Sequence, residues 1–367
     1  MFPVMKSASK VNGIAFCILL AVMLVYSIPK VVSFLRTQPD ALALFLDGRL
    51  LRQLEMTYDR EFVLRDTAIR TWADLQYLVF GEGSKGVVIG RNGWLFTNEE
   101  YMIPNDYSHA VAQHVRNIAE IEEQLRQHNK RLILMPVPMK LDIYAEYAQR
   151  RFDARTAGIY DDFVARLAEQ KIETAPVRSA FLSAKDSTQL FLKTDTHWSP
   201  YGANLAAHEV ARQHPELIGK APYATQHVAQ KGYHGDLLNF IQVSDWLVPW
   251  PLLGDNIPVF ETISRNQSLD DAFLFDDQSE SIMLVGSSYT KIDDWNFPGF
   301  LKESLQNDLL TTAVEARGPF QAMDDFLAGK QLRNDSIKTV IWEFPVRTLL
   351  AQKPSSNSWQ ATMNQFF

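Results

Sequence analysis

The chain has 367 residues, of which 46% are hydrophobic and 22% are charged, and its formal net charge is -7. This composition is that of a globular protein with a large buried core, and it excludes extended disorder. Because the net charge is negative and no Lys/Arg cluster is interleaved with aromatic residues, we expect no nucleic-acid binding. The single cysteine, Cys17, excludes an intramolecular disulfide and a zinc site built from cysteines.

The N-terminal segment predicts a membrane anchor. Lys6 and Lys10 precede an apolar run over residues 13–28 that continues toward Leu35. A run of this length after basic residues is typical of a helix that crosses the bacterial inner membrane with its N-terminus in the cytoplasm. The alternatives are a cleaved signal peptide, which would need small residues at a cleavage site, and a buried core helix. We therefore expect residues 1–36 to be the cytoplasmic N-terminus and anchor, with the rest of the chain in the periplasm.

The remaining chain divides into a connecting segment and one large domain. Residues 37–80 carry apolar positions at helical spacing, which predicts a helical stalk. Residues 81–367 predict the domain itself. Within it, residues 222–281 lack a clear hydrophobic period and predict an irregular insertion.

Helices and short apolar strands alternate through the large domain. Two apolar runs that flank an Asn-Gly turn at residues 90–93 predict a β-hairpin. Buried strands are predicted at residues 131–137, 172–176, 189–192, 282–285 and 339–344, with helices at 111–125, 160–170, 177–184 and from 200 to 210. This alternation predicts an α/β fold, a three-layer α/β/α sandwich around a mainly parallel sheet.

Two loops of this fold carry residues suited to acyl transfer. Ser288 follows the strand at 282–285 after Gly286, at the carboxyl end of a strand, where open α/β sheets bind ligands. A serine needs a base to take its proton and a third group to orient that base. Asp195 and His197 lie between the strand predicted at 189–192 and the next helix. If both strands belong to one parallel sheet, the two loops meet, and Ser288, His197 and Asp195 form a catalytic triad.

Simpler interpretations of these residues remain open. The Gly-Ser-Ser turn can be only a turn, and an Asp-x-His pair before a helix can be only a cap. Metal binding is a further use of Asp195 and His197, but the sequence has no HExxH motif, and we expect no metal. Residues 81–86 match GxGxxG, yet a strand follows them instead of the helix that a dinucleotide fingerprint opens, so we expect no cofactor.

Four motifs resemble a known family. They are Thr194–Ala203, Gly286–Tyr289, Gly90–Phe96 and Trp342–Arg347. Together they resemble the alginate O-acetyltransferase family (AlgJ/AlgX-like), whose domain is SGNH-hydrolase-like, over about residues 58–348. The order of the Asp-His pair before the serine is the circularly rearranged order of this family. Because the chain ends soon after its last strand, it is similar to the membrane-anchored AlgJ type, which lacks a C-terminal carbohydrate-binding module.

The resemblance implies roles for individual residues. Ser288 matches the family nucleophile, His197 the base and Asp195 the carboxylate that orients it. Ser287, Tyr289 and Trp198 stand beside them as candidates for the oxyanion site or for binding a sugar.

The resemblance also implies a function and partners. We expect a periplasmic O-acetyltransferase that acetylates an exported exopolysaccharide, of the alginate or acetylated cellulose type, through an acetyl-serine intermediate. Its expected partners are a membrane-bound O-acyltransferase that exports acetyl groups, the polysaccharide acceptor and other polysaccharide-export proteins. Two alternatives use the same sequence features: an acetylesterase with the same triad, and a non-catalytic polysaccharide-binding scaffold.

Overall fold

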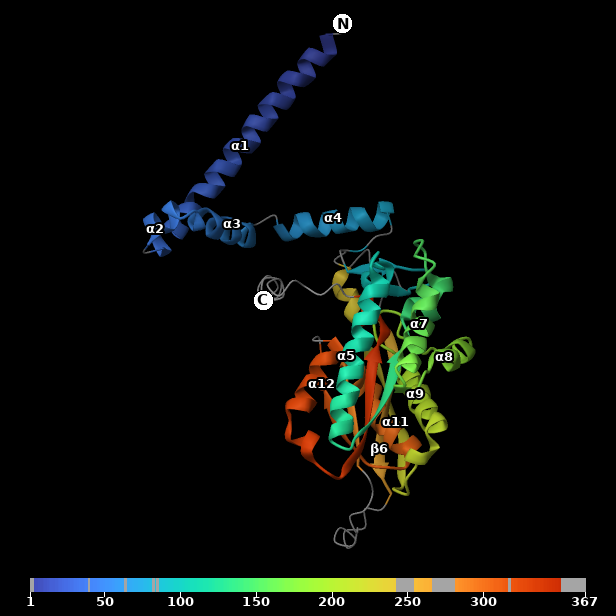
Figure 1. Ribbon diagram of the computed structural model, residues 1–367. Helices are drawn as coiled ribbons and strands as arrows, with labels where there is room; N and C mark the ends of the chain where they lie inside the picture. The colour runs from blue at the N-terminus through green and yellow to red at the C-terminus, as the bar shows by residue number, and fades with distance from the viewer. Residues whose placement is uncertain are drawn as a thin grey trace. The chain divides into compact units, whose positions relative to one another are not determined.

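The computed structural model describes residues 3–38, 40–62, 65–80, 83, 86–241, 254–265, 281–315 and 318–350. The chain forms two compact units, Met1–Trp72 and Ala73–Phe367. The division falls inside helix α4, Arg65–Phe80, whereas the sequence placed the end of the stalk at residue 80. The functional division into anchor, stalk and domain stays a prediction. Figure 1 shows the elements in chain order.

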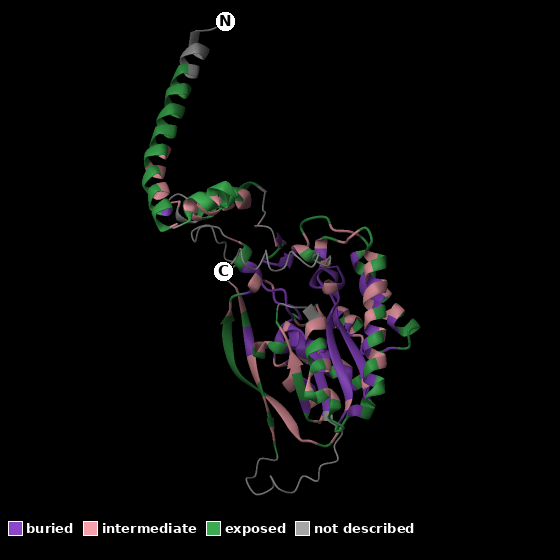
Figure 2. Ribbon diagram, turned by 60° about the vertical axis from the view of Figure 1, so that its left-hand side comes forward, coloured by how far each residue is buried: buried purple, intermediate pink, exposed green. Residues whose placement is uncertain are grey.

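The first unit consists of helices. They are α1 (Pro3–Thr37), α2 (Ala41–Leu46), α3 (Arg49–Glu61) and the first half of α4. Within α1, Lys10–Thr37 has a mean hydropathy of 2.3 and is long and apolar enough to cross a membrane, and none of its most apolar stretch is buried. Figure 2 shows the described part of this helix mostly in the colour of exposed residues, with intermediate ones toward its C-terminal end. Pro29 lies inside the helix, so the apolar run continues toward Leu35 as the sequence predicts.

A five-stranded parallel sheet forms the centre of the second unit. Its strand order is β4-β3-β9-β7-β8, and every neighbouring pair is parallel. The strands are β3 (Arg131–Val137), β4 (Glu173–Thr174), β7 (Ser281–Gly286), β8 (Leu309–Ala313) and β9 (Ile337–Pro345). The mainly parallel sheet is therefore confirmed.

Helices cover both faces of the sheet, which makes the three layers. Successive residues of a strand point to opposite faces, and in β3 Leu132 and Leu134 pack into one hydrophobic cluster while Ile133 and Met135 pack into another. One cluster includes α5 (Tyr107–Gln127), α7 (Thr156–Glu169) and α12 (Gly318–Ala328); the other includes α9 (Pro200–Gln213) and α11 (Phe297–Leu305). Figure 1 shows α5 and α12 side by side on the same face.

Shorter elements complete the described part of this unit. The predicted hairpin is present as β1 (Val87–Ile89) paired antiparallel with β2 (Leu95–Thr97). The remaining described α-helices of this unit are α6 (Lys140–Ile143), α8 (Arg178–Ala184) and α10 (Ser288–Lys291). Both α8 and the helix predicted from residue 200 are confirmed.

Two expectations about this unit differ from the structure. Residues 189–192 form no strand of the sheet, only an isolated antiparallel bridge between Phe191 and Trp198. The region predicted to be irregular contains a long antiparallel ribbon, β5 (Tyr223–Tyr233) with β6 (Asp255–Ser264). Most of β5 is exposed on both faces, so its residues do not alternate between apolar and polar and leave no period to read. Residues 242–253 and 266–280 of this region lie outside the described residues.

Candidate active site

Ser288 lies where strand β7, between β9 and β8 in the sheet, turns sharply into a short helix. The strand ends at Gly286, Ser287 caps the helix, and Ser288 is the first residue of α10. A Cβ atom at Gly286 would lie 2.1 Å from Thr290 Oγ1, so only glycine allows the turn to be this tight. The turn leaves Ser288 partly exposed at the carboxyl end of the strand, as the sequence predicts.

Asp195 and His197 lie in an irregular loop and not at the end of a sheet strand. Two backbone hydrogen bonds close this loop: Ser199 N donates to Leu190 O at 2.8 Å, and Leu192 N donates to His197 O at 3.2 Å. Ser199 then caps α9, and its side chain accepts from Gly202 N at 3.2 Å. The predicted cap is confirmed, but the predicted strand before the loop is wrong.

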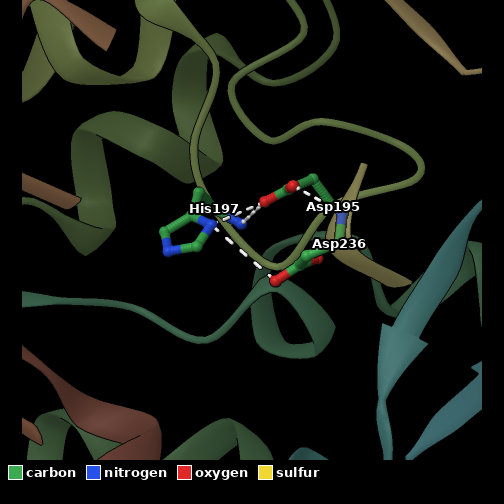
Figure 3. Close-up of side chains that lie close together, drawn as sticks. All are labelled: Asp195, His197 and Asp236. Atoms are coloured by element: carbon green, nitrogen blue, oxygen red, sulfur yellow. Dashed lines mark hydrogen bonds and ion pairs between the residues drawn. The ribbon is translucent and has the colours of Figure 1, made fainter. Parts of the chain in front are cut away.

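The two loops bring three side chains into one chain of hydrogen bonds. His197 Nε2 lies 2.7 Å from Ser288 Oγ, and His197 Nδ1 lies 2.6 Å from Asp195 Oδ1. A carboxylate only accepts, so Nδ1 carries the ring proton and donates it to Asp195, while Nε2 is left to accept from the serine hydroxyl. Figure 3 shows Asp195 and Asp236 on the Nδ1 side of the ring. The structure thus places together the three residues that the sequence grouped.

The carboxylate of Asp195 is buried and charged. Burial alone would raise its pKa, but the hydrogen bond and electrostatic attraction from His197, with the backbone N–H groups of Asp236 and His197, lower it to about 2. Its second oxygen, Oδ2, accepts from the backbone N–H of Asp236 at 2.8 Å. Asp195 is therefore ionised throughout the neutral range and fixes the orientation of the imidazole.

Two further carboxylates hold the backbone of the same loop. Asp255 accepts from the N–H groups of Lys193 and Thr194 at 2.9 and 2.8 Å. Asp236 accepts from Thr196 N at 2.8 Å and from Thr196 Oγ1 at 2.6 Å. These N–H groups have no partner in a neighbouring strand. The carboxylate oxygens therefore accept the hydrogen bonds that the carbonyl groups of a sheet would otherwise accept.

A buried lysine holds the carbonyl groups of this loop. Lys140 Nζ donates to Lys193 O and Asp195 O, both at 2.9 Å, and to Leu95 O of the hairpin at 2.5 Å. Burial lowers the pKa of Lys140 to about 8, against the opposing effect of Asp255 and Glu100. The ammonium group thus connects the loop of Asp195 to β2.

A buried glutamate lies beneath the serine turn. Glu343, on β9, accepts from Ser287 N at 2.7 Å, from Ser287 Oγ at 2.9 Å and from Thr290 Oγ1 at 3.1 Å. Burial raises its pKa, although the hydrogen bonds from Ser287 oppose that shift. Glu343 therefore connects both ends of the turn that presents Ser288 to the neighbouring strand.

Aromatic rings enclose His197. The ring of Tyr289 lies 4.7 Å from it between centroids, and Trp295 stacks on it at 5.8 Å and 26°. Tyr289 donates its hydroxyl to Thr196 O at 2.8 Å, and its ring meets Trp198 edge to face. These packed rings leave the imidazole little freedom to rotate away from Ser288.

The three residues suggested for oxyanion or sugar binding are all buried. The N–H and hydroxyl of Ser287 are both directed at Glu343. Trp198 lies wholly in the core against Tyr289 and Phe297, and Tyr289 uses its hydroxyl on the backbone of the loop. Burial of this kind favours a structural role over contact with a polymer.

Asp195, His197 and Asp236 lie close enough to hold a metal ion, within 4.8 Å of one another. However, all four carboxylate oxygens already accept hydrogen bonds, three of them from the backbone N–H groups of Thr196, His197 and Asp236. A cation would meet the positive hydrogens of these donors at the same oxygens. The donor set therefore fits an oriented imidazole better than a metal centre.

Sequence reasoning missed four of the residues that support the site. Three of them lie outside the motifs of the triad: Lys140, Asp236 and Asp255. The fourth, Glu343, lies inside one of the quoted motifs but had no role assigned to it. The signal available was a charged residue directly after or within an apolar strand, as for Lys140 and Glu343, because a buried charge needs a specific partner.

A parallel sheet covered on both faces, with this serine turn and Asp-x-His loop, defines an SGNH-hydrolase-like protein. Residues 87–346 match the family model described as SGNH hydrolase-like domain, acetyltransferase AlgX, and the chain belongs to that family.

Relatives of known name support this membership. The chain is 33% identical over 317 residues to a "Probable alginate O-acetylase AlgJ" of Pseudomonas aeruginosa. The matched region covers 83% of this chain and 81% of that relative. A similar relative from Azotobacter vinelandii, also 33% identical, carries the same name. The solved O-acetyltransferase domain of Pseudomonas putida AlgJ matches with a TM-score of 0.66 and 28% identity, over 77% of this chain and 99% of that domain. The structure of Pseudomonas aeruginosa AlgX, 22% identical with a TM-score of 0.57, supports the fold.

Proposed function

We propose that the protein is a periplasmic O-acetyltransferase that acetylates hydroxyl groups of an exported polysaccharide of the alginate type, with Ser288 as its nucleophile. The observation that carries the proposal is the unbroken chain of hydrogen bonds from Ser288 Oγ through His197 to Asp195. The family membership supports acetyl transfer as the reaction, and the names of the relatives support alginate as the polymer.

The first half-reaction loads the enzyme. His197 Nε2 takes the proton of Ser288 as Oγ attacks the carbonyl carbon of an acetyl donor. The bond between the acetyl group and its carrier then breaks, and His197 returns the proton to the departing carrier atom. The product is acetyl-Ser288, with His197 neutral again and Asp195 ionised throughout.

The second half-reaction passes the acetyl group to the polymer. A sugar hydroxyl gives its proton to His197 and attacks the acetyl carbonyl; the ester to Ser288 breaks, and Oγ recovers the proton. A bound hydroxyl can reach an effective molarity on the order of 10^5 M or more, so binding the sugar beside Ser288 favours transfer over hydrolysis by water.

Negative charge develops on the acetyl oxygen in both steps and needs hydrogen-bond donors. The backbone N–H of Ser288 has no acceptor within the described part of the chain, and it is the donor we assign to the oxyanion. The N–H of Ser287 is committed to Glu343, which excludes it from that role.

The proposed setting follows from the N-terminal helix. With α1 as a single-pass anchor in the bacterial inner membrane, the domain with Ser288 faces the periplasm, where an exported polysaccharide passes. A membrane-bound O-acyltransferase is the partner that would deliver acetyl groups there, together with other polysaccharide-export proteins.

The test compares the full-length protein with Ser288→Ala, and with Ser183→Ala on the exposed face of α8 as the matched control. Each is given an acetyl donor with and without polysaccharide, and acetylated glycan and free acetate are both measured. We expect Ser288→Ala to lower transfer by about three orders of magnitude or more, and the control to retain it. Free acetate alone, unchanged by glycan, would identify an esterase, and full transfer by Ser288→Ala would leave only a scaffold.

A further inference from the structure

Helix α2 exposes an unusually apolar surface. All six of its residues, Ala41–Leu46, are apolar, and none is buried. Leu42, Phe45 and Leu46 are 74, 59 and 78% exposed. A helix this short is not stable alone in water, and water-soluble proteins rarely leave several large apolar side chains exposed together. The surface therefore needs a cover.

The unit that contains α2 supplies almost no core of its own. Among the side chains described from residue 10 to residue 72, only two apolar ones are buried, Phe34 and Leu50. The remaining apolar surface of α1 is explained by the membrane that its length and hydropathy fit. Residues 38–40 are all that separates α1 from α2 in the chain. The apolar surface of α2 therefore follows directly after the apolar surface of the span.

Contacts hold α3 against the outer part of α1. Tyr58 OH lies 2.7 Å from Ser27 Oγ, and Tyr26 meets Phe62 edge to face with 5.7 Å between ring centroids. Tyr58 and Phe62 stack at 5.9 Å. These contacts join α3, and through it α2, to the helix that the membrane is proposed to surround.

Electrostatic attraction contributes little to holding α2 at a membrane surface. Arg49 is paired with Asp47 at the start of α3, and Asp40 precedes α2, so acidic groups offset the nearby arginines. An attachment at this point would depend on apolar insertion and would change little with salt.

We propose that α2 and the start of α3 lie in the outer-leaflet interface of the membrane that α1 spans, with Leu42, Phe45 and Leu46 inserted among the acyl chains. The proposal rests on the proposed anchoring of α1 but not on the chemistry of Ser288. The anchor then consists of a spanning helix and a short apolar helix at the interface, and lipid is the occupant of the exposed face.

The single native cysteine makes a depth measurement direct. Cys17 lies inside the span and, labelled in the native full-length protein, provides the reference for a deep position. In a Cys17→Ser background, Phe45→Cys carries the same environment-sensitive fluorophore on α2, and Ser183→Cys carries it on an exposed surface of the other unit. Each protein is reconstituted alone into vesicles of phosphatidylcholine and phosphatidylglycerol, with or without bromine on the acyl chains.

We expect brominated lipid to quench the label at position 45 about twofold, the label at Cys17 at least as strongly, and the label at position 183 not at all. High salt should not reverse the quenching at position 45. A label at position 45 that stays unquenched while Cys17 is quenched would overturn the proposal, and so would quenching that appears only with a second membrane protein or that is lost at high salt. Acetyl transfer measured on the same vesicles reports separately on the proposed function.

Discussion

At the scale of single residues, the site depends on buried charges with specific partners. Three buried residues show this: Asp195, Glu343 and Lys140. The two carboxylates accept hydrogen bonds from nearby donors, and the lysine ammonium donates to nearby carbonyl groups. A buried charge that loses its partners costs far more than a surface charge, so these residues fix one arrangement of the site. The pKa of each is shifted accordingly, and the shifts lead to measurable consequences.

Asp195→Asn tests the orienting carboxylate. Asparagine retains the size of the side chain but no longer fixes the tautomer of His197, and we expect kcat to fall by about 10^4-fold with KM little changed. Kinetics of acetyl transfer by the full-length variant measure this. A fall of less than tenfold would contradict the role given to Asp195.

The same carboxylate makes stability depend on pH. Its pKa is about 2 in the folded protein and about 3.9 in an unfolded chain, so the folded state favours the charged form. The stabilisation, about 2 to 3 kcal/mol, is complete above about pH 4 and is lost as the pH falls through 2. Thermal unfolding of the wild type and Asp195→Asn from pH 7 to pH 2 measures it. The gap between their free energies of unfolding should narrow below pH 4, and a constant gap would refute the assignment.

Glu343 supports the serine turn and should reveal itself through stability. In Glu343→Ala the buried N–H and hydroxyl of Ser287 lose their acceptor, and we expect the free energy of unfolding to fall by about 2 to 4 kcal/mol. Glu343→Gln retains one acceptor oxygen and is the matched control, with a loss of about 1 kcal/mol or less. Equal losses in the two variants would show that the hydrogen bonds are not what stabilises the turn.

At the scale of elements, the turn from β7 into α10 has no room for a side chain. A Cβ at Gly286 would lie 2.1 Å from Thr290 Oγ1 and 2.9 Å from Glu343 Oε2, so Gly286→Ala must shift α10 and with it Ser288. A displacement on the order of 1 Å at a reacting group lowers the rate about 10^2-fold. Gly158→Ala is the control, because nothing lies within 4 Å of its Cβ and helix α7 should gain up to about 1 kcal/mol. Kinetics and thermal unfolding of both variants check this, and full activity of Gly286→Ala would refute it.

At the scale of the whole molecule, the second unit has the means to fold without the anchor. Its sheet is covered on both faces by its own helices, and Tyr77 of α4 packs on a cluster that includes Val87, Leu95 and Leu237. The triad lies entirely within it. We therefore expect a chain that begins at Arg65 to fold and to retain transfer to soluble acceptors within about threefold.

The same truncation should fail in the cell. Without α1 the domain is no longer held beside the membrane, and acetylation of the exported polymer should drop although the exported protein is present in normal amount. The acetyl content of the polymer and the level of the protein measure this. Normal acetylation by the truncated chain would show that the anchor is dispensable.

The sequence by itself determined the local elements that carry the site. Apolar runs located β3, β7 and β9, because a strand buried on both faces is mostly apolar, and Gly286 marked the turn before Ser288. Ser199 marked the start of α9, because its side chain accepts from the first turn of the helix. Each of these signals depends on residues close together in the chain.

Only the tertiary structure decided how the two halves of the site meet. The loop of Asp195 and His197 does not follow a sheet strand; its backbone is held by Asp236, Asp255 and Lys140, which lie about 40 to 60 residues away in the chain. The ribbon β5–β6 was missed because most of β5 is exposed and carries no hydrophobic period. Hydrogen bonds between distant side chains leave no pattern in a single sequence, so folding alone brings these partners together.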